Sequence, residues 1–336
     1  MALLDIIIFL ISWVMLFISS RWLVKSLARL SRFLGWREFI VSFFIVSIVG
    51  STPNLFVGVL SALNKVPQLS LGDVLGGNLI DLSLVIGLAA LFAKKGIPAK
   101  SRTVQTTALY TIFVAILPIL LISDGVLGRA DAIILILLFI AYLLWVFSNK
   151  ERFTLIYPGK SDETWKKEVR KIKESHGPFV FFERIKIIFK NAGIAIAGTI
   201  LMAIASIGIV KSSLSIIHIY NIYPIVFGTL IISFGNCLTD AFFSIDAAIA
   251  NRTWMILGDL MGSVIVTGTL VLGIVALICP INVPLLLYFS IARVFLIVAA
   301  LLFLFFIRTG KVITKKEASI LFLVYIVFII IEFFAK

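Results

Sequence analysis

The sequence predicts an all-α membrane protein with ten transmembrane helices, arranged as two five-helix repeats of inverted topology. Three observations lead to this fold class. Hydrophobic residues make up 61% of the 336 residues, charged residues make up only 14%, and the mean hydropathy is +1.15. Apolar runs of about 18 residues or more, each long enough to cross a hydrocarbon core about 30 Å thick, recur along the chain. The sequence also matches itself without a gap when it is shifted by 186 residues.

The composition excludes several classes of protein. A soluble domain carries about 25% charged residues, and a chain with only 14% cannot cover a water-facing surface. The net charge of +13 does not indicate a nucleic-acid partner, because the basic residues lie between the apolar runs, where cytoplasmic loops hold them. Cys237 and Cys279 fit neither a disulfide framework nor a metal-ligand spacing. The chain has no nucleotide-binding motif, and we expect no cofactor.

The hydropathy pattern gives each expected span in turn. The first apolar run lacks a basic leader and a small-residue cleavage site, so we interpret it as a retained span. Residues 1–148 hold the first five spans, residues 149–190 form a basic linker, and residues 191–336 hold the last five. The ten spans run roughly over residues 3–24, 38–63, 69–92, 104–123, 130–148, 192–216, 222–249, 254–278, 285–307 and 316–335.

The Lys and Arg residues predict the orientation of these spans. If the N-terminus is outside, the loops on the inner side hold 25 of the 30 basic residues and Arg293 lies within the ninth span. Because cytoplasmic loops carry an excess of Lys and Arg, we expect a multi-pass protein of the cell membrane. Both termini should lie outside and the 149–190 loop in the cytoplasm. The four basic residues on the outer side are Lys65, Arg129, Lys211 and Lys336.

The internal repeat keeps its register across polar residues. Ser47 aligns with Ser233, and Gly72-Asp73 aligns with Gly258-Asp259. A similarity caused by apolar composition alone would not preserve Asp and Gly in one register. Since five spans is an odd number, the second repeat must enter the membrane with the opposite topology. Inverted repeats are typical of secondary transporters, whose binding sites lie near the membrane midplane where the repeats meet.

Polar residues interrupt the second and third spans of each repeat at equivalent places. Gly and Pro in the middle of a span free backbone carbonyls, which is tolerated only where they line a cavity. Hydroxyls and carboxylates beside these carbonyls form an oxygen-rich environment that suits Ca²⁺ and Na⁺. A carboxylate near the bilayer centre costs at least about 2.5–3.5 kcal/mol, so it indicates function. The four stretches are residues 47–54, 72–81, 233–240 and 258–267.

These stretches resemble the α-repeats of the calcium/cation antiporter superfamily, which includes the sodium/calcium and proton/calcium exchangers. The family pattern reads G-T-S-L-P-E in one span and G-N-x-x-G-S-N-x-x-[ND] in the next, and the resemblance covers nearly the whole chain. It implies a central core of the second, third, seventh and eighth spans, which holds the ions. It also implies that the first and sixth spans slide against this core to alternate access.

The departures from the family pattern concern the charged positions. Asn54 stands where the first motif ends in Glu, Asp81 where Asn is usual, and Asp240 where the second motif ends in Glu. The usual Thr-Ser pair becomes Gly50-Ser51 in one half and Asn236-Cys237 in the other. Two carboxylates remain, Asp81 and Asp240, and we expect them to bind Ca²⁺. Carried over position by position, the resemblance implies an ion-binding set of Ser51, Asn54, Asp81, Asp240, Ser263 and Thr267, which backbone carbonyls near Ser47 and Ser233 complete.

The resemblance implies an antiporter that exchanges Ca²⁺ for Na⁺ or H⁺ and runs on ion gradients alone. Two carboxylates can neutralise one Ca²⁺ or two monovalent ions, so we expect electroneutral or weakly electrogenic exchange. The two repel each other when both are ionised, which makes proton coupling feasible. We expect a monomer whose partners are membrane lipid and small inorganic cations.

The altered ligand set leaves other hypotheses open. The first is a related exchanger of Mg²⁺, Mn²⁺ or monovalent cations only. The second is an intramembrane enzyme with Asp81 and Asp240 as a carboxylate pair, which the lack of a nucleophile or a metal-binding His disfavours. The third is a sensor or scaffold that binds ions without transporting them.

Four further charged residues lie within or beside the spans. Asp73 and Asp259 replace the family's Asn after Gly, and they are either access-path or gating carboxylates or helix-end acids in polar surroundings. Asp246 and Arg293 would each be costly unpaired, so an intramembrane pair between them is one expectation. The alternatives are that Arg293 reaches Asp240 and neutralises the ion site, that it extends toward the membrane surface, or that it has other partners.

Overall fold

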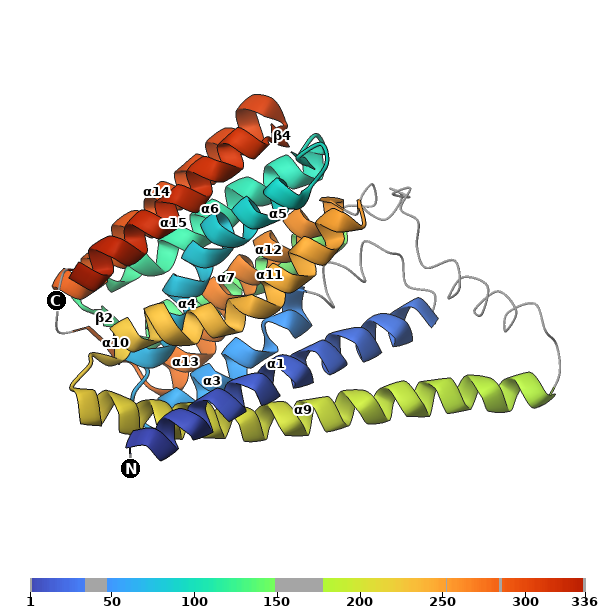
Figure 1. Cartoon of the computed structure of the whole chain (residues 1–336), viewed down its shortest axis with the longest axis horizontal. Coiled ribbons are helices and arrows are strands. Elements are labelled where there is room, and N and C mark those ends of the chain that lie inside the picture. Colours follow the sequence, from blue (N-terminus) through green and yellow to red (C-terminus); the bar gives the residue numbers. More distant parts are fainter. Residues whose placement is uncertain (1, 34–46, 149–177, 252, 284–285, 335–336) are drawn as a thin grey trace.

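The computed structural model describes residues 2–33, 47–148, 178–251, 253–283 and 286–334 (Figure 1). Within these ranges, nine helices are long and apolar enough to cross a membrane, and Ser47–Leu63 is a shorter apolar helix. The predicted all-α membrane fold is therefore confirmed. The expected second span is described only from Ser47 onward. Most of the expected 149–190 linker lies outside the described residues.

The first half of the chain contains long helices, a π-helical stretch at residues 47–49 ahead of α3, and a third span that is interrupted in its middle. The residue that begins the interruption is Asp81, where the helical hydrogen bonding changes to a π-helical turn. In order, the elements are α1 (Ala2–Phe33), α3 (Thr52–Leu63), α4 (Gln68–Ile80), the π-helical turn η2 (Asp81–Val85), α5 (Ile86–Phe92), α6 (Arg102–Leu121), the 3-10 turn η3 (Ile122–Asp124) and α7 (Arg129–Ser148).

The second half contains two interrupted helices. π-helical turns are often found at functional sites, since they break the regular pattern of backbone hydrogen bonds. In order, the elements are α9 (Pro178–Tyr220), α10 (Pro224–Phe227), the π-helical turn η5 (Gly228–Ile232), α11 (Ser233–Ile249), α12 (Thr253–Ile265), the π-helical turn η6 (Val266–Val271), α13 (Leu272–Ile278), α14 (Leu286–Gly310) and α15 (Lys315–Phe334).

Two short antiparallel ladders tie the halves together. Strand β1 (Ile97–Pro98) pairs with β4 (Val312–Ile313), and β2 (Val126–Leu127) pairs with β3 (Ile281–Asn282). Each ladder joins a loop of the first half to a loop of the second. Each ladder therefore fixes a loop of the first half to a loop of the second half.

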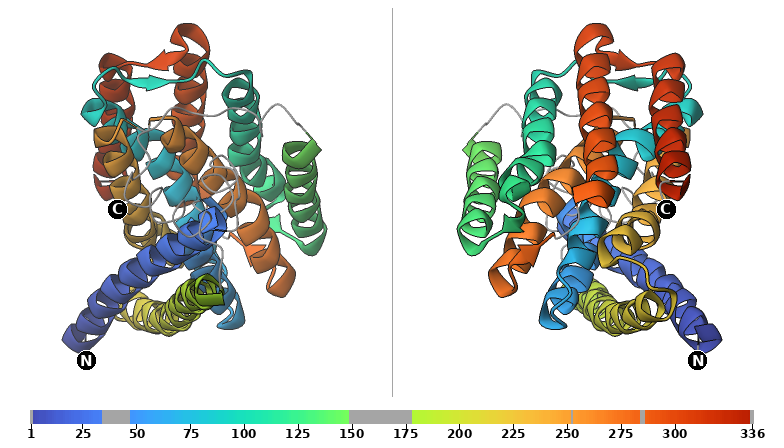
Figure 2. Two further views of the ribbon diagram at one scale, coloured as in Figure 1. Left: turned by 90° about the vertical axis from the view of Figure 1, so that its right-hand side faces the viewer. Right: turned by 90° about the vertical axis from the view of Figure 1, so that its left-hand side faces the viewer.

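The interrupted helices form the centre of the molecule. In their most apolar windows, 83% of residues are buried for Gln68–Phe92 and 78% for Met255–Ile278, against 28% for Leu3–Leu27. The helices α1 and α9 contact each other along one edge, and α14 and α15 lie at the opposite edge (Figures 1 and 2). Polar residues near the middle of Gln68–Phe92 and Met255–Ile278 are therefore enclosed by protein.

Glycine allows two central helices to touch through their backbones. A Cβ atom on Gly72 would lie 2.1 Å from the carbonyl oxygen of Ile225, and one on Gly76 would lie 2.3 Å from that of Thr229. No larger residue fits at either position. Small residues four apart bring membrane helices close in this way, and here they hold α4 against α10 and η5. This contact places the polar residues of α4 beside those of α11.

Candidate cation-binding site

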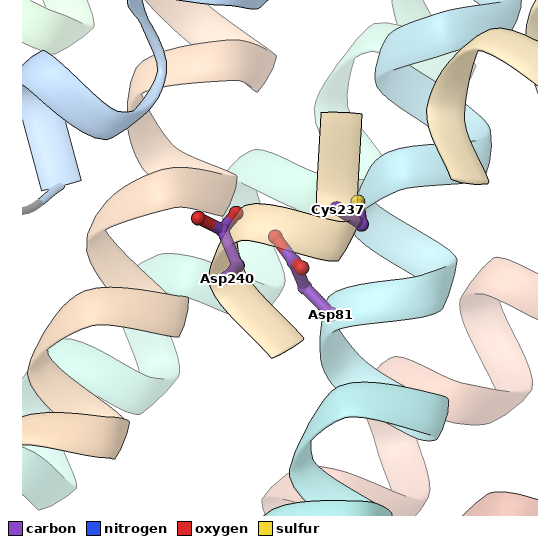
Figure 3. A group of neighbouring side chains, drawn as sticks. All are labelled: Asp81, Cys237 and Asp240. Carbon is purple, nitrogen blue, oxygen red and sulfur yellow. The ribbon is translucent and has the colours of Figure 1, made fainter. Parts of the chain in front are cut away.

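The centre of the bundle contains a cluster of two carboxylates and a thiol. Asp81 begins η2, while Cys237 and Asp240 lie about one turn apart on α11. One ligand atom from each of the three residues lies within 4.8 Å of the others. Asp81 is 1% exposed, Cys237 is 4% exposed and Asp240 is half-buried. Figure 3 shows both carboxylates directed into the same space between the helices. The cluster is a candidate metal site.

The hydrogen bonds of the cluster leave oxygen atoms available for a cation. The Ser263 hydroxyl donates to Asp240 Oδ2 at 3.4 Å. Among the described residues, Asp81 Oδ1 has no hydrogen-bond partner although it is buried. The Cys237 thiol makes a weak contact of 3.6 Å with the carbonyl oxygen of Gly77. A buried carboxylate oxygen without a donor is unfavourable, and a bound cation would remove this cost.

Besides Asp81 and Asp240, a further acidic residue, Asp73, lies on α4 and is fully buried. Asn54 Nδ2 donates to Asp73 Oδ2 at 3.2 Å, and Asn236 Nδ2 lies 3.0 Å from both carboxylate oxygens. One amide comes from α3 and the other from α11, so both halves of the chain contribute. The structure therefore brings Asn54 to Asp73, and the sequence did not indicate that Asn236 joins them.

Asp259 on α12 is equally buried but has different surroundings. It is 1% exposed, and neither carboxylate oxygen has a hydrogen-bond partner among the described residues. It interacts electrostatically with both Asp240 and Asp81. Asp259 therefore counts as a third acid of this region, where the sequence indicated two. Neither Asp73 nor Asp259 lies at a helix end, in contrast to one of the two interpretations of the sequence.

The predicted hydroxyl ligands donate their protons mostly to backbone carbonyls. Ser47 Oγ lies 3.2 Å from the carbonyl of Gly258, Ser51 donates to the carbonyl of Ser47 at 2.7 Å, and Ser233 donates to that of Thr229. A hydroxyl that donates its proton still has two lone pairs. These oxygens can therefore still accept a cation.

Thr267 is turned toward a residue that sequence analysis missed. Its hydroxyl lies 2.8 Å from Asn78 Oδ1 and 2.8 Å from the carbonyl of Ser263. The amide nitrogen of Asn78 has no hydrogen-bond partner among the described residues. Asn78 occupies an Asn position of the family pattern in the third span, and this match could have identified it.

The expected pair between Asp246 and Arg293 stays a prediction. Asp246 is exposed near the end of α11. Arg293 lies on α14 and interacts with another group of the protein. An approach of Arg293 to Asp240 likewise stays a prediction.

The fold and the cluster together define a class of protein. A multi-pass helical membrane protein with carboxylates buried at helix interruptions has the features of an ion transporter. Comparison with known proteins gives the family. The model of the family described as "Sodium/calcium exchanger protein" matches residues 4–148 and 190–334. This chain belongs to the sodium/calcium exchanger family, whose members are transmembrane cation antiporters and not enzymes.

Individual proteins show the same relationship. The chain is 25% identical to the sodium/calcium exchanger MaX1 of Methanosarcina acetivorans, over 98% of this chain and 99% of that protein. It is 24% identical to an uncharacterised membrane protein of Methanocaldococcus jannaschii, over 94% of this chain and 93% of that protein. Its fold is similar to that of the sodium-calcium exchanger NCX_Mj soaked with Na⁺ and Sr²⁺, with a TM-score of 0.65, 21% identity and coverage of 98% and 99%.

Proposed function

We propose that this protein is a secondary active antiporter that exchanges Ca²⁺ for Na⁺ or H⁺ by alternating access. The ions bind near the membrane midplane, between two inverted repeats. The observation that carries the proposal is the meeting of Asp81 and Asp240. The first comes from the first matched range and the second from the other, and their carboxylates are directed into one space (Figure 3). Each ionised carboxylate would be costly there without a cation.

Several features support an inverted repeat with an offset of 186 residues. The two ranges matched by the family model are displaced by this number, and so are β2 and β4. The π-helical turns η2 and η6 start 185 residues apart and end 186 residues apart. Equivalent helices also make equivalent contacts across the two halves, since α7 packs on α13 and α15 packs on α5.

The arrangement of α1 and α9 is consistent with alternating access. These two helices contact each other along one edge of the bundle (Figure 1). In the proposed cycle they slide together against the central helices, so that the acidic cluster opens to one side of the membrane at a time. The ladders β1–β4 and β2–β3 would keep the loops of the core fixed to each other during this movement.

The proposed orientation follows from the basic residues. Both termini lie outside, and the 149–190 loop lies in the cytoplasm of a multi-pass cell-membrane protein, since 25 of the 30 Lys and Arg residues are then inside. The exchanged cations are substrates, and we propose that the protein needs no cofactor and works as a monomer.

The proposed ion ligands are those that the family pattern indicates, with Asp259 as a third acid. Ca²⁺ takes about six to eight oxygen ligands, more than the two carboxylates supply. The hydroxyl of Ser263 lies beside Asp240 and could complete the shell, together with Ser47, Ser51, Ser233 and Thr267. The amide nitrogen of Asn54 donates to Asp73, and its amide oxygen can still bind a cation. A third acid would allow the site to hold one more positive charge than the sequence suggested.

A second candidate is a related exchanger with changed selectivity, for Mg²⁺, Mn²⁺ or monovalent cations only. The placement of Asn54 favours it, because a neutral amide that binds Asp73 removes one acid from the position where the family pattern has Glu. This candidate shares the fold and the cluster with the first. The two differ only in which cation is carried.

Calcium uptake into proteoliposomes tests the proposal. Vesicles containing the protein are given an outward Na⁺ gradient and, separately, an outward H⁺ gradient, and uptake of radioactive Ca²⁺ is followed. We expect uptake under at least one gradient, and its loss in Asp81→Asn and Asp240→Asn. Asp246→Asn is the matched control, since Asp246 lies on the same helix as Asp240 but is exposed. Absence of uptake under both gradients contradicts Ca²⁺ exchange and directs the test to Mg²⁺, Mn²⁺ and Na⁺/H⁺ exchange.

A further inference from the structure

The acidic cluster contains one ligand that a calcium site does not need. Cys237 is 4% exposed, and its sulfur lies within 4.8 Å of a carboxylate oxygen of both Asp81 and Asp240. Figure 3 shows the thiol beside the two carboxylates, on the same helix as Asp240. Ca²⁺ binds oxygen ligands, whereas thiolates select softer ions such as Zn²⁺. The thiol therefore bears directly on which divalent ions the site holds.

The dimensions of the cluster fit a single small cation. Bonds of about 2.3 Å to sulfur and about 2.0–2.2 Å to carboxylate oxygen are typical of Zn²⁺. In the tetrahedral geometry of Zn²⁺, two ligands at these distances would lie about 3.4–3.7 Å apart. The ligand atoms of Asp81, Cys237 and Asp240 lie within 4.8 Å of one another. A small inward shift of the side chains would bring all three into contact with one ion.

Two further features indicate that the cluster can accept a ligand. Asp81 Oδ1 is buried without a hydrogen-bond partner among the described residues. The thiol contacts the carbonyl of Gly77 at 3.6 Å and also interacts with the carboxylate of Asp81, and a thiol is a weak hydrogen-bond donor. Binding a metal would therefore give Asp81 Oδ1 a partner and replace only weak contacts of the thiol.

We propose that Cys237 acts with Asp81 and Asp240 as a ligand for thiol-binding divalent cations such as Zn²⁺ and Cd²⁺, which this site holds more tightly than Ca²⁺. The inference rests on the proposed function, in that the cluster is the cation site of the antiporter. When the metal–sulfur bond forms, the S–H bond breaks and its proton passes to solvent, as is usual for thiolate ligands. No electron is transferred, so no oxidant or reductant is needed.

Titration of the purified full-length protein with Cd²⁺ tests this inference. Binding to a thiolate gives a charge-transfer absorption in the near ultraviolet. The chain has two cysteines, so Cys279→Ser is a matched control for Cys237→Ser. We expect the absorption to saturate at one Cd²⁺ per protein molecule in the unmodified protein and in Cys279→Ser. We expect no such absorption in Cys237→Ser. Loss of an outer-sphere partner already weakens metal binding about 10- to 100-fold, so loss of this ligand should weaken Cd²⁺ binding at least about tenfold.

The possible results separate this inference from the proposed function. The inference is wrong if saturating Cd²⁺ produces no thiolate signal, or if Cys279→Ser loses the signal and Cys237→Ser keeps it. Ca²⁺ uptake by the same preparations is measured in parallel. Uptake without a thiolate signal supports Ca²⁺ exchange and overturns the inference, whereas a signal without uptake supports the thiol ligand and overturns Ca²⁺ exchange. A cooperative thermal unfolding transition in Cys237→Ser, like that of Cys279→Ser, establishes that this variant is folded.

Discussion

Asp73 and Asp259 occupy equivalent positions in the two halves of the chain, yet their surroundings are opposite. Asp73 accepts hydrogen bonds from the amides of Asn54 and Asn236. Asp259 is just as buried, but neither of its oxygens has a hydrogen-bond partner among the described residues. It instead interacts with the negative charges of Asp240 and Asp81. Two equivalent sequence positions can therefore hold one carboxylate that accepts hydrogen bonds and one that accepts none.

The reason lies in the two residues that correspond to the amides. With an offset of 186 residues, the counterpart of Asn54 is Asp240, and the counterpart of Asn236 is Gly50. An ionised carboxylate cannot donate a hydrogen bond, and glycine has no side chain. Asp259 thus lacks both of the donors that Asp73 has.

The difference indicates where the cation is needed. A buried charge without a partner costs several kcal/mol, and pairing or coordination removes that cost. When ionised, the pair of Asn54 and Asp73 carries one charge and is hydrogen-bonded, whereas Asp240 and Asp259 carry two charges and repel each other. On this account Asp73 stabilises the protein, and the cation binds between Asp81 and Asp240 with the charge of Asp259 nearby. Three substitutions test this difference between the two acids, and they are expected to affect transport to decreasing extents.

The largest effect is expected from Asp240→Asn. This change makes the second half resemble the first, because an amide at residue 240 can donate to Asp259 as Asn54 does to Asp73. Ca²⁺ uptake should fall at least about 100-fold, the upper end of the loss seen for outer-sphere partners. The cation-free protein should unfold at a higher temperature than the unmodified one, because a buried repulsion is lost. Uptake that persists in Asp240→Asn would contradict the account.

A smaller effect is expected from Asp259→Asn. This acid interacts with Asp81 and Asp240 through its charge, so its removal should weaken Ca²⁺ binding by about tenfold, a typical outer-sphere effect. The midpoint of thermal unfolding without cations should rise. In the comparison variant Asp73→Asn the midpoint should fall, because a charge that accepts amide hydrogen bonds is lost. Equal changes of the midpoint in both variants would mean that the two acids are equivalent.

The smallest effect on transport is expected from Asn236→Ala. The substitution removes a donor that lies 3.0 Å from both oxygens of Asp73. Hydrogen bonds to charged groups contribute about 1.5–3 kcal/mol each, so the free energy of unfolding should fall by about that amount, while Ca²⁺ affinity stays near that of the unmodified protein.

The matched control for this substitution is Asn54→Ala, which removes one longer hydrogen bond of 3.2 Å to the same carboxylate. Its loss of stability should be the smaller of the two. A large loss of Ca²⁺ affinity in Asn236→Ala without a change in stability would instead make Asp73 a cation ligand.

Much of the fold could be predicted from the sequence, because apolar runs and their length determine where a chain crosses the membrane. The third expected span, 69–92, differs by one residue from the observed span Gln68–Phe92. The interruption at Asp81 was also marked by its polar neighbours. The positions of loop residues such as Val126 and Ile313, which pair in separate ladders, could not be predicted from hydropathy.

The candidate site was harder to predict, because its contacts cross between the halves. The offset between repeats identifies equivalent residues but does not reveal which residues meet. Asn236 reaches Asp73 from the other half of the chain, and Thr267 faces Asn78 in the same way. Cys237 was noted as a departure from the family pattern, but only the geometry places its sulfur beside two carboxylates.

The most direct test of the central claim is to locate a bound divalent cation in crystals of the protein. Crystals soaked with Sr²⁺, an ion that gives a strong anomalous signal, would show its position without reference to any variant. The account predicts a peak between the carboxylates of Asp81 and Asp240, and none at Asp73. A peak at Asp73, or at neither place under saturating Sr²⁺, would contradict it.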